Sequence, residues 1–322
     1  MDEMVGARIR APALALAFPL GLPLPLPLGL PLPLVLVLVL VLGQARAADD
    51  PLVQPSLVAA SASIRPGGEV VVGVRLRLAP GWHVYWINPG DAGTAVQVAW
   101  DLPEGFAAGA LEWPVPSRFE AGGIASYGYS GEPVLLATLR APASAAPGTR
   151  ARIAARLDWL VCSEESCIPG EATVSLDIEV AAAEPHPSAE APILDAARAR
   201  LPRAPAGLRA TIVAQDDETI VLRVEPPADL PLDGRTAAAG LFFPEREGLI
   251  EAAEEQAVRP VAGGAVEITL PRTSIVKGRV AEVRGVLRVK RLQPTTEEFG
   301  VALGADAIDT GRKGQEKQER AR

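Results

Sequence analysis

The sequence is poor in the side chains that carry most redox and metal chemistry. Its 322 residues include two cysteines, two histidines and two methionines, and aromatic residues make up 4% of the chain. Both methionines, Met1 and Met4, precede residue 47, so the rest of the chain offers no thioether ligand to a soft metal. Any thiol chemistry must therefore pass through the only two cysteines, Cys162 and Cys167.

Long apolar runs are also missing, except near the N-terminus. Arg8 and Arg10 precede an apolar stretch, and residues 45–47 (ARA) provide a small-x-small site for a signal peptidase. Prolines interrupt this stretch, and only residues 34–42 run unbroken, well short of the roughly 20 residues that a spanning helix needs. We therefore predict a cleaved signal peptide over residues 1–47, with an uncleaved membrane anchor as the alternative.

Lys is scarce whereas Arg and Ala are frequent, which is typical of a GC-rich bacterial genome. For an exported bacterial protein, the predicted compartment is the periplasm. A disulfide persists in such an oxidising compartment. Excess positive charge is absent as well: without the three Arg and two acidic residues of the leader, 28 basic side chains face 37 acidic ones, a net charge of −9. Such a surface argues against nucleic acid as a partner.

Apolar and polar residues alternate along most of the remaining chain. The period of two is clearest over residues 70–78 and 174–180, which predicts strands with one buried face. Shorter strands fit residues 96–100, 134–139, 220–224, 266–270 and 283–289, with Pro-Gly turn signals between them. A long helical period is missing, so the pattern predicts an all-β chain of two tandem antiparallel β-sandwiches.

The predicted domains follow from breaks in this pattern. The first sandwich spans residues 48–183 and contains the cysteine pair. A Pro- and Ala-rich linker follows at 184–205, with a short helix at 192–201. The second sandwich spans 206–303, and the polar residues 304–322 are expected to be a disordered tail.

The cysteines flank the turn of a predicted hairpin. Leu157, Trp159 and Val161 alternate into Cys162, and four residues separate Cys162 from Cys167. This is not the two-residue spacing of a thioredoxin-type motif, and the adjacent Glu164 and Glu165 disfavour a thiolate by like-charge repulsion. The spacing alone leaves two interpretations open, an inert structural disulfide and a reactive pair.

Other candidate sites are weaker. His83, between Trp82 and Val84 at a strand entry, is more typical of a structural histidine than of a metal ligand. Copper bound by His83 and the two cysteines is an alternative, since thiolates suit Cu(I). Residues 128–132 (GYSGE) fall one glycine short of a nucleophile elbow and fit a turn. No cofactor is expected.

Four motifs of the first domain carry a resemblance to a known family. They are residues 81–93 (GWHVYWINPGDAG), 112–119 (EWPVPSRF), 127–129 (YGY) and 159–170 (WLVCSEESCIPG). Together they resemble the N-terminal periplasmic domain of the transmembrane disulfide reductase DsbD and, more closely, its relative ScsB, the copper-sensitivity suppressor. Residues 240–244 (GLFFP) and 274–278 (SIVKG) are similar to the second sandwich of the ScsB group.

The resemblance implies an immunoglobulin-like fold and a protein-disulfide reductase module. By position, Cys167 matches the cysteine that forms a mixed disulfide with target proteins, and Cys162 matches the one that resolves it. Phe119 matches a cap phenylalanine that shields the pair, although the acidic pair that precedes this cap in the family is Ser117 and Arg118 here.

Three aromatic residues of these motifs, Tyr127, Tyr129 and Trp159, are candidates for lining the cysteine site, with core packing as their alternative. The polytopic and thioredoxin-like domains that usually follow in the family are not found before Arg322. The expected electron donor is therefore a separate membrane-embedded disulfide reductase, and the expected acceptors are oxidised periplasmic thiol proteins. The other interpretation is a non-catalytic module that binds a protein partner or copper and has a closed disulfide.

Overall fold

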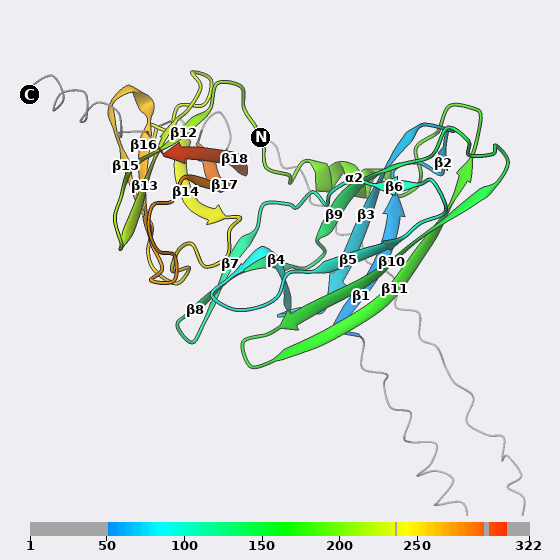
Figure 1. Cartoon of the computed structure of the whole chain (residues 1–322), viewed down its shortest axis with the longest axis horizontal. Helices are drawn as coiled ribbons and strands as arrows, with labels where there is room; N and C mark the ends of the chain where they lie inside the picture. The colour runs from blue at the N-terminus through cyan, green and yellow to red at the C-terminus, as the bar shows by residue number, and fades with distance from the viewer. Residues whose placement is uncertain (1–50, 236, 293–295, 308–322) are drawn as a thin grey trace, which may run out of the picture. The chain divides into compact units, whose positions relative to one another are not determined.

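Alternating apolar residues build an all-β chain, as the sequence predicts (Figure 1). The computed structural model describes residues 51–235, 237–292 and 296–307, which belong to one compact unit beginning at Pro51. The predicted signal peptide lies outside the described residues, and so does the predicted tail beyond residue 307. None of the described helices is long and apolar enough to cross a membrane.

The first sandwich contains two sheets. The smaller has the order β1 (Val53–Ala59), β3 (Glu69–Leu78), β9 (Val134–Arg140) and β6 (Ala107–Ala108). The larger has the order β2 (Ser63–Ile64), β11 (Cys167–Val180), β10 (Arg150–Cys162), β4 (His83–Gly90), β8 (Ile124–Ser130) and β7 (Ser117–Ala121), and β5 (Gln97–Asp101) pairs with β10.

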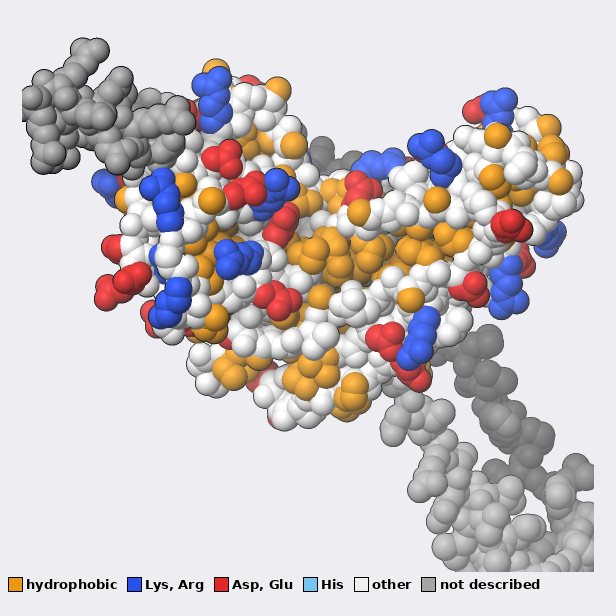
Figure 2. Space-filling view, in the orientation of Figure 1, with side chains coloured by type: hydrophobic (Ala, Val, Ile, Leu, Met, Phe, Trp, Pro, Cys, Tyr) orange, Lys and Arg blue, Asp and Glu red, His pale blue; other side chains and the backbone are white. Residues whose placement is uncertain are grey.

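The two sheets enclose one core. The alternating apolar residues of β3 are all buried, whereas Arg75 and Arg77 on its other face pair with Glu132. Partly buried side chains such as Trp100 and Trp113 pack against this core. Figure 2 shows hydrophobic side chains gathered in a band across the middle of the visible face.

Within the described part of the chain, the linker forms one α-helix, α2 (Ala191–Arg198), which agrees with the short helix expected there. Its buried face, Leu194 and Ala197, packs against Val134 and Leu136 of β9. The residues that follow the helix bond to the second sandwich, since the Arg203 amide donates to the Gly300 carbonyl at 2.8 Å.

In the second sandwich the described strands form one continuous sheet, which encloses its own core. Its order is β14 (Ala237–Pro244), β17 (Glu282–Arg291), β18 (Glu297–Ala307), β12 (Arg209–Gln215), β13 (Thr219–Glu225), β16 (Val266–Pro271) and β15 (Ala257–Pro260), with a 3₁₀ turn, η1 (Ala262–Gly264), after β15. Strand β12 joins the two halves because it pairs antiparallel with β13 and parallel with β18.

Apolar side chains from both halves meet in this core, for example Leu222 and Ile268 from one half and Leu287 and Val301 from the other. Strand β18 continues to Ala307, past the expected start of the tail at residue 304. The expectation of disorder is therefore wrong for residues 304–307, because Ala305 is buried and pairs with Val283.

Candidate functional site

The two cysteines close the end of the β10–β11 hairpin. They are the last cross-strand pair of a ladder that runs without interruption from Arg150, and they form a disulfide. The turn between them is ordered by Ser163, whose amide donates to the Ser166 carbonyl at 2.8 Å and whose hydroxyl accepts bonds from two amides of the turn. The hairpin predicted from the apolar alternation on either side of the cysteines is confirmed.

The two sulfur-bearing residues differ in access to solvent. Cys162 is only 2% exposed, whereas Cys167 is exposed. Cys162 also has a strand on each side, because it lies opposite Cys167 of β11 and opposite His83 of β4. Of the two residues, Cys167 is therefore the one that an incoming thiolate can approach from solvent.

Strand β4 places a hydrogen-bond donor beneath the disulfide. Tyr85 is buried, and its hydroxyl donates to Cys162 Sγ at 2.8 Å and lies 3.9 Å from Cys167 Sγ. Burial raises the pKa of Tyr85 above its ordinary value of 10.0, so this hydroxyl keeps its proton at neutral pH. It is positioned to stabilise negative charge that develops on Cys162.

The position of Tyr85 depends on a glycine in the loop after β4. Gly93 has a φ of +120°, a backbone conformation that residues with a Cβ rarely adopt. A Cβ built on it would come within 2.2 Å of the Tyr85 ring. Gly93 therefore supplies both the backbone conformation and the space that the tyrosine needs.

The aromatic ring of Phe119, the residue expected to cap the pair, lines the same cleft as the cysteines. Phe119 is on β7, which pairs with β8, and its ring stacks on His83 with 4.4 Å between centroids and 8° between planes. His83 in turn contacts the Tyr85 ring edge-on at 5.3 Å. The series Phe119, His83, Tyr85 and the two cysteines lines one cleft of about 640 Å³.

His83 is thus part of the site, although sequence reasoning favoured a structural role for it. The available signal was its period of two with Tyr85, which places both on the same face of β4. Among the described residues, no group of three or more His, Cys, Asp or Glu side chains is arranged to hold a metal ion.

The stacked position of His83 has a consequence for acid stability. Burial lowers the pKa of His83 from 6.5, so below that value the unfolded chain binds a proton that the folded protein resists. The stabilising contribution is present above pH 6.5 and is lost as the pH falls from there toward the lowered folded value. We expect the free energy of unfolding of the wild type, minus that of His83→Gln, to decrease as the pH falls through this window.

Urea unfolding at several pH values checks this expectation. The acidic residues shared by the two proteins cancel in the difference. His186→Gln is the matched control, because it removes the other histidine, which lies in the linker. A difference between wild type and His83→Gln that stays constant with pH contradicts the assignment.

The charges at the cleft are acidic. Glu120, Glu164 and Glu165 line it, and the described lining residues include neither Lys nor Arg. Glu120 pairs with Arg118, while Glu165 accepts a hydrogen bond from Ser163 at 2.8 Å. A partner with positive charge near its own cysteines fits this rim.

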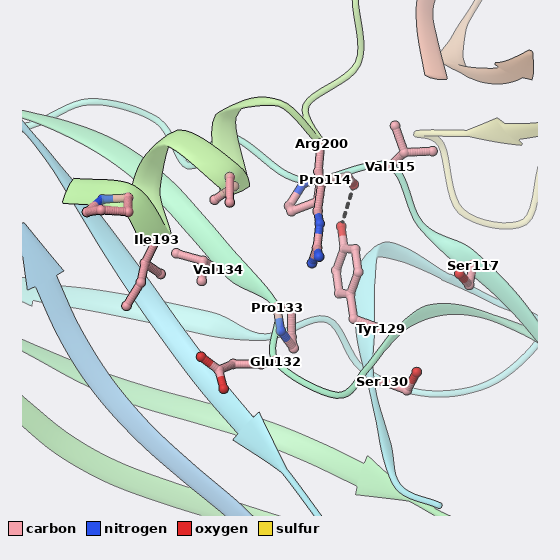
Figure 3. A pocket seen from close by; sticks show the side chains of 13 residues that line it. Pro114, Val115, Ser117, Tyr129, Ser130, Glu132, Pro133, Val134, Ile193 and Arg200 are labelled. Carbon is pink, nitrogen blue, oxygen red and sulfur yellow. Dashed lines mark hydrogen bonds between the residues drawn. The ribbon is translucent and has the colours of Figure 1, made fainter. Parts of the chain in front are cut away.

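Tyr127, Tyr129 and Trp159, expected as candidates for lining the site, lie elsewhere. Tyr127 is fully buried against Phe243, with 5.0 Å between centroids. Tyr129 lines a separate pocket of about 670 Å³ beside α2, where its hydroxyl donates to the Pro114 carbonyl at 2.7 Å (Figure 3). The Trp159 ring packs over Gly170, its partner across the hairpin.

Strand alternation explains why the two tyrosines do not line the cleft. In β8 the cleft is lined by Ser126 and Ser130, so Tyr127 and Tyr129 face the opposite side. Only the alternative interpretation of these residues, core packing, agrees with their burial.

The first sandwich carries a disulfide at a hairpin end, with one cysteine exposed and an aromatic ring alongside, an arrangement that suits a thiol-disulfide interchange module. Residues 49–178 match the family described as "Thiol:disulfide interchange protein DsbD, N-terminal". This match covers the first sandwich and agrees with the resemblance that the motifs of the first domain carry.

Two bacterial structures are among the solved structures that this chain matches. The N-terminal periplasmic domain of ScsB from Proteus mirabilis is 17% identical, and the match covers 80% of this chain and 95% of that one, with a TM-score of 0.49. The reduced DsbD N-terminal domain of Neisseria meningitidis is 16% identical and matches over 42% of this chain and 90% of that one, with a TM-score of 0.24. A search of curated protein sequences finds no match.

Proposed function

We propose that this protein is a periplasmic protein-disulfide reductase module that passes electrons through Cys162 and Cys167. The observation that carries the proposal is the asymmetry of the pair: Cys167 is exposed at the hairpin end, whereas Cys162 is buried beside the Tyr85 hydroxyl. The match of residues 49–178 to the DsbD N-terminal family supports it.

The reaction takes place in two exchanges. In the reduced protein, the Cys167 thiolate attacks one sulfur of an oxidised partner, an S–S bond to the partner forms, and the partner's other sulfur leaves as a thiolate. The Cys162 thiolate then attacks Cys167, which restores the internal disulfide and releases the second partner sulfur. Two electrons pass to the partner, and both of its thiolates take up protons from solvent.

Reduction of the internal disulfide reverses these steps. A dithiol donor attacks Cys167 Sγ, and Cys162 leaves as a thiolate, toward which the Tyr85 hydroxyl is already directed at 2.8 Å. The donor's second thiolate resolves the mixed disulfide, so the donor is oxidised as the module is reduced. We propose a membrane-embedded disulfide reductase as this donor and oxidised periplasmic thiol proteins as the acceptors.

A purely structural disulfide is the competing interpretation. The ring that Cys162 and Cys167 close is small, and loop-closure entropy gives it a stabilisation of only about 2 kcal/mol. The β10–β11 hairpin is already held by an uninterrupted ladder and by the Ser163 turn. The exposure of Cys167 adds to this argument, because a stabilising disulfide does not require an accessible sulfur.

A redox titration decides between the two interpretations. We expect the pair to equilibrate with dithiothreitol and glutathione buffers at a reduction potential above about −300 mV, since structural disulfides typically lie below that value. Alkylation of free thiols followed by mass spectrometry measures the reduced fraction. A double variant, Cys162→Ser with Cys167→Ser, supplies the background, and a potential below that limit would contradict the proposed function.

A further inference from the structure

The strand that carries the cap is at the edge of its sheet. Strand β7 is the last in the order of the larger sheet, and β8 is its one partner there among the described strands. An edge strand this short needs further contacts to hold a side chain at a fixed place. Those contacts come from the second sandwich.

Two arginines bridge β7 and the residue before it to the second sandwich. Arg118 donates from Nε to the Ala252 carbonyl at 3.0 Å and from Nη2 to the Ala253 carbonyl at 2.8 Å. From the other side, Arg288 of β17 donates to the Pro116 carbonyl at 2.9 Å. These bonds hold the chain at Pro116 and Arg118, and Phe119 follows Arg118 directly.

The strand that supports β7 is tied to the same segment. The Asp91 carboxylate accepts hydrogen bonds from the Ala125 amide of β8 at 3.0 Å and from the Ala252 amide at 2.9 Å. Ala252 is 2% exposed, so little water competes for its amide and carbonyl. Both β7 and β8 are therefore fastened to one loop of the second sandwich, at and next to the buried Ala252.

Strand alternation separates the two roles within β7. Phe119 and Arg118 are neighbours, so their side chains leave opposite faces of the strand. Phe119 stacks on His83 in the cleft, while Arg118 reaches the carbonyls of the second sandwich. Only a donor fits carbonyl acceptors, which explains why a basic residue is suitable where the family has an acidic one.

We propose that the second sandwich is a brace for the cap, and that Arg118 is a positioning residue that holds Phe119 beside the disulfide. This inference rests on the proposed function for its purpose but not for its test. It assigns the second sandwich a role in controlling access to the cysteines rather than that of a spacer.

The test removes the bonds from each side separately. Arg118→Met and Arg288→Met lose the donors and keep much of the apolar stem. Arg140→Met is the matched control, because Arg140 is an exposed arginine of the first sandwich that pairs with Glu69 and does not contact the second. Amide hydrogen exchange of residues 117–121 is measured on the oxidised proteins, together with the rate at which dithiothreitol reduces the disulfide.

We expect exchange of residues 117–121 to be at least about tenfold faster in both bridging variants than in the control, because charge-assisted hydrogen bonds are lost. Reduction by dithiothreitol should accelerate in parallel, and Arg118→Lys should restore part of the effect. In a Phe119→Ala background, Arg118→Met should not accelerate reduction further, since the ring it positions is gone.

Two results overturn the brace: exchange at 117–121 equal to that of Arg140→Met, or acceleration by Arg118→Met that persists undiminished without Phe119. A different result identifies failure of the proposed function. If exchange rises as expected while dithiothreitol reduces none of the proteins, the brace stands and the disulfide is structural.

Discussion

Reduced Cys162→Ser protein should form a stable mixed disulfide with cystamine at Cys167. Reduced Cys167→Ser protein should react at about one tenth of that rate or more slowly. The reason is access: the remaining cysteine is an exposed residue in the first variant and a residue only 2% exposed in the second. Cystamine is a suitable probe because its two ammonium groups match a cleft lined by acidic side chains. Mass spectrometry of the intact protein follows the adduct.

The wild type supplies the comparison for the second exchange. Its Cys162 should attack the mixed disulfide and expel cysteamine, so that the adduct is transient and the internal disulfide returns. Equal reactivity of the two single variants would remove the distinction between an attacking and a resolving cysteine. A Cys162→Ser protein that forms no adduct would contradict a reactive Cys167 altogether.

The strands and the hairpin could be predicted because they depend on local patterns. The alternation in β3 and the apolar residues before Cys162 each report a single face or a single turn. The same rule places His83 and Tyr85 on one face of β4. If one of them lies near the cysteines, the alternation therefore predicts that the other faces the same side.

The errors concern which face meets the site and which parts of the chain meet across long separations. Tyr127 and Tyr129 have the spacing of a site-lining pair, but only the pairing of β8 with β4 and β7 shows that the serines of β8 face the cleft. The partners of Arg118 lie 134 and 135 positions away, beyond the reach of periodicity or turn chemistry. The basic residue before Phe119 therefore looked like a departure from the family, and the structure gives it a function.

Gly93→Ala should destabilise the protein by about 2–4 kcal/mol and slow the reduction of the disulfide, because it disturbs Tyr85. Two costs add at this position. The φ of +120° is strained for alanine, and its Cβ would come within 2.2 Å of the Tyr85 ring. Urea unfolding measures the first effect, and the rate of reduction by dithiothreitol measures the second.

Tyr85→Phe separates the hydroxyl from the ring. It keeps the packing against Gly93 and His83 but removes the donor to Cys162 Sγ, so we expect reduction about tenfold slower with a small change in stability. Gly93→Ala should slow the reaction to a similar degree if its methyl group displaces the same hydroxyl. A Gly93→Ala protein with wild-type stability and rate contradicts the close contact.

A double variant tests whether the clash with Tyr85 is the cause. Tyr85→Ala removes the ring that the methyl group of Gly93→Ala would strike, leaving the backbone strain alone. The destabilisation by Gly93→Ala should therefore be smaller in the Tyr85→Ala background than in the wild type. Strict additivity would assign the whole cost to the backbone and would mean that Gly93 is required for the loop conformation rather than for the position of Tyr85 beneath the disulfide.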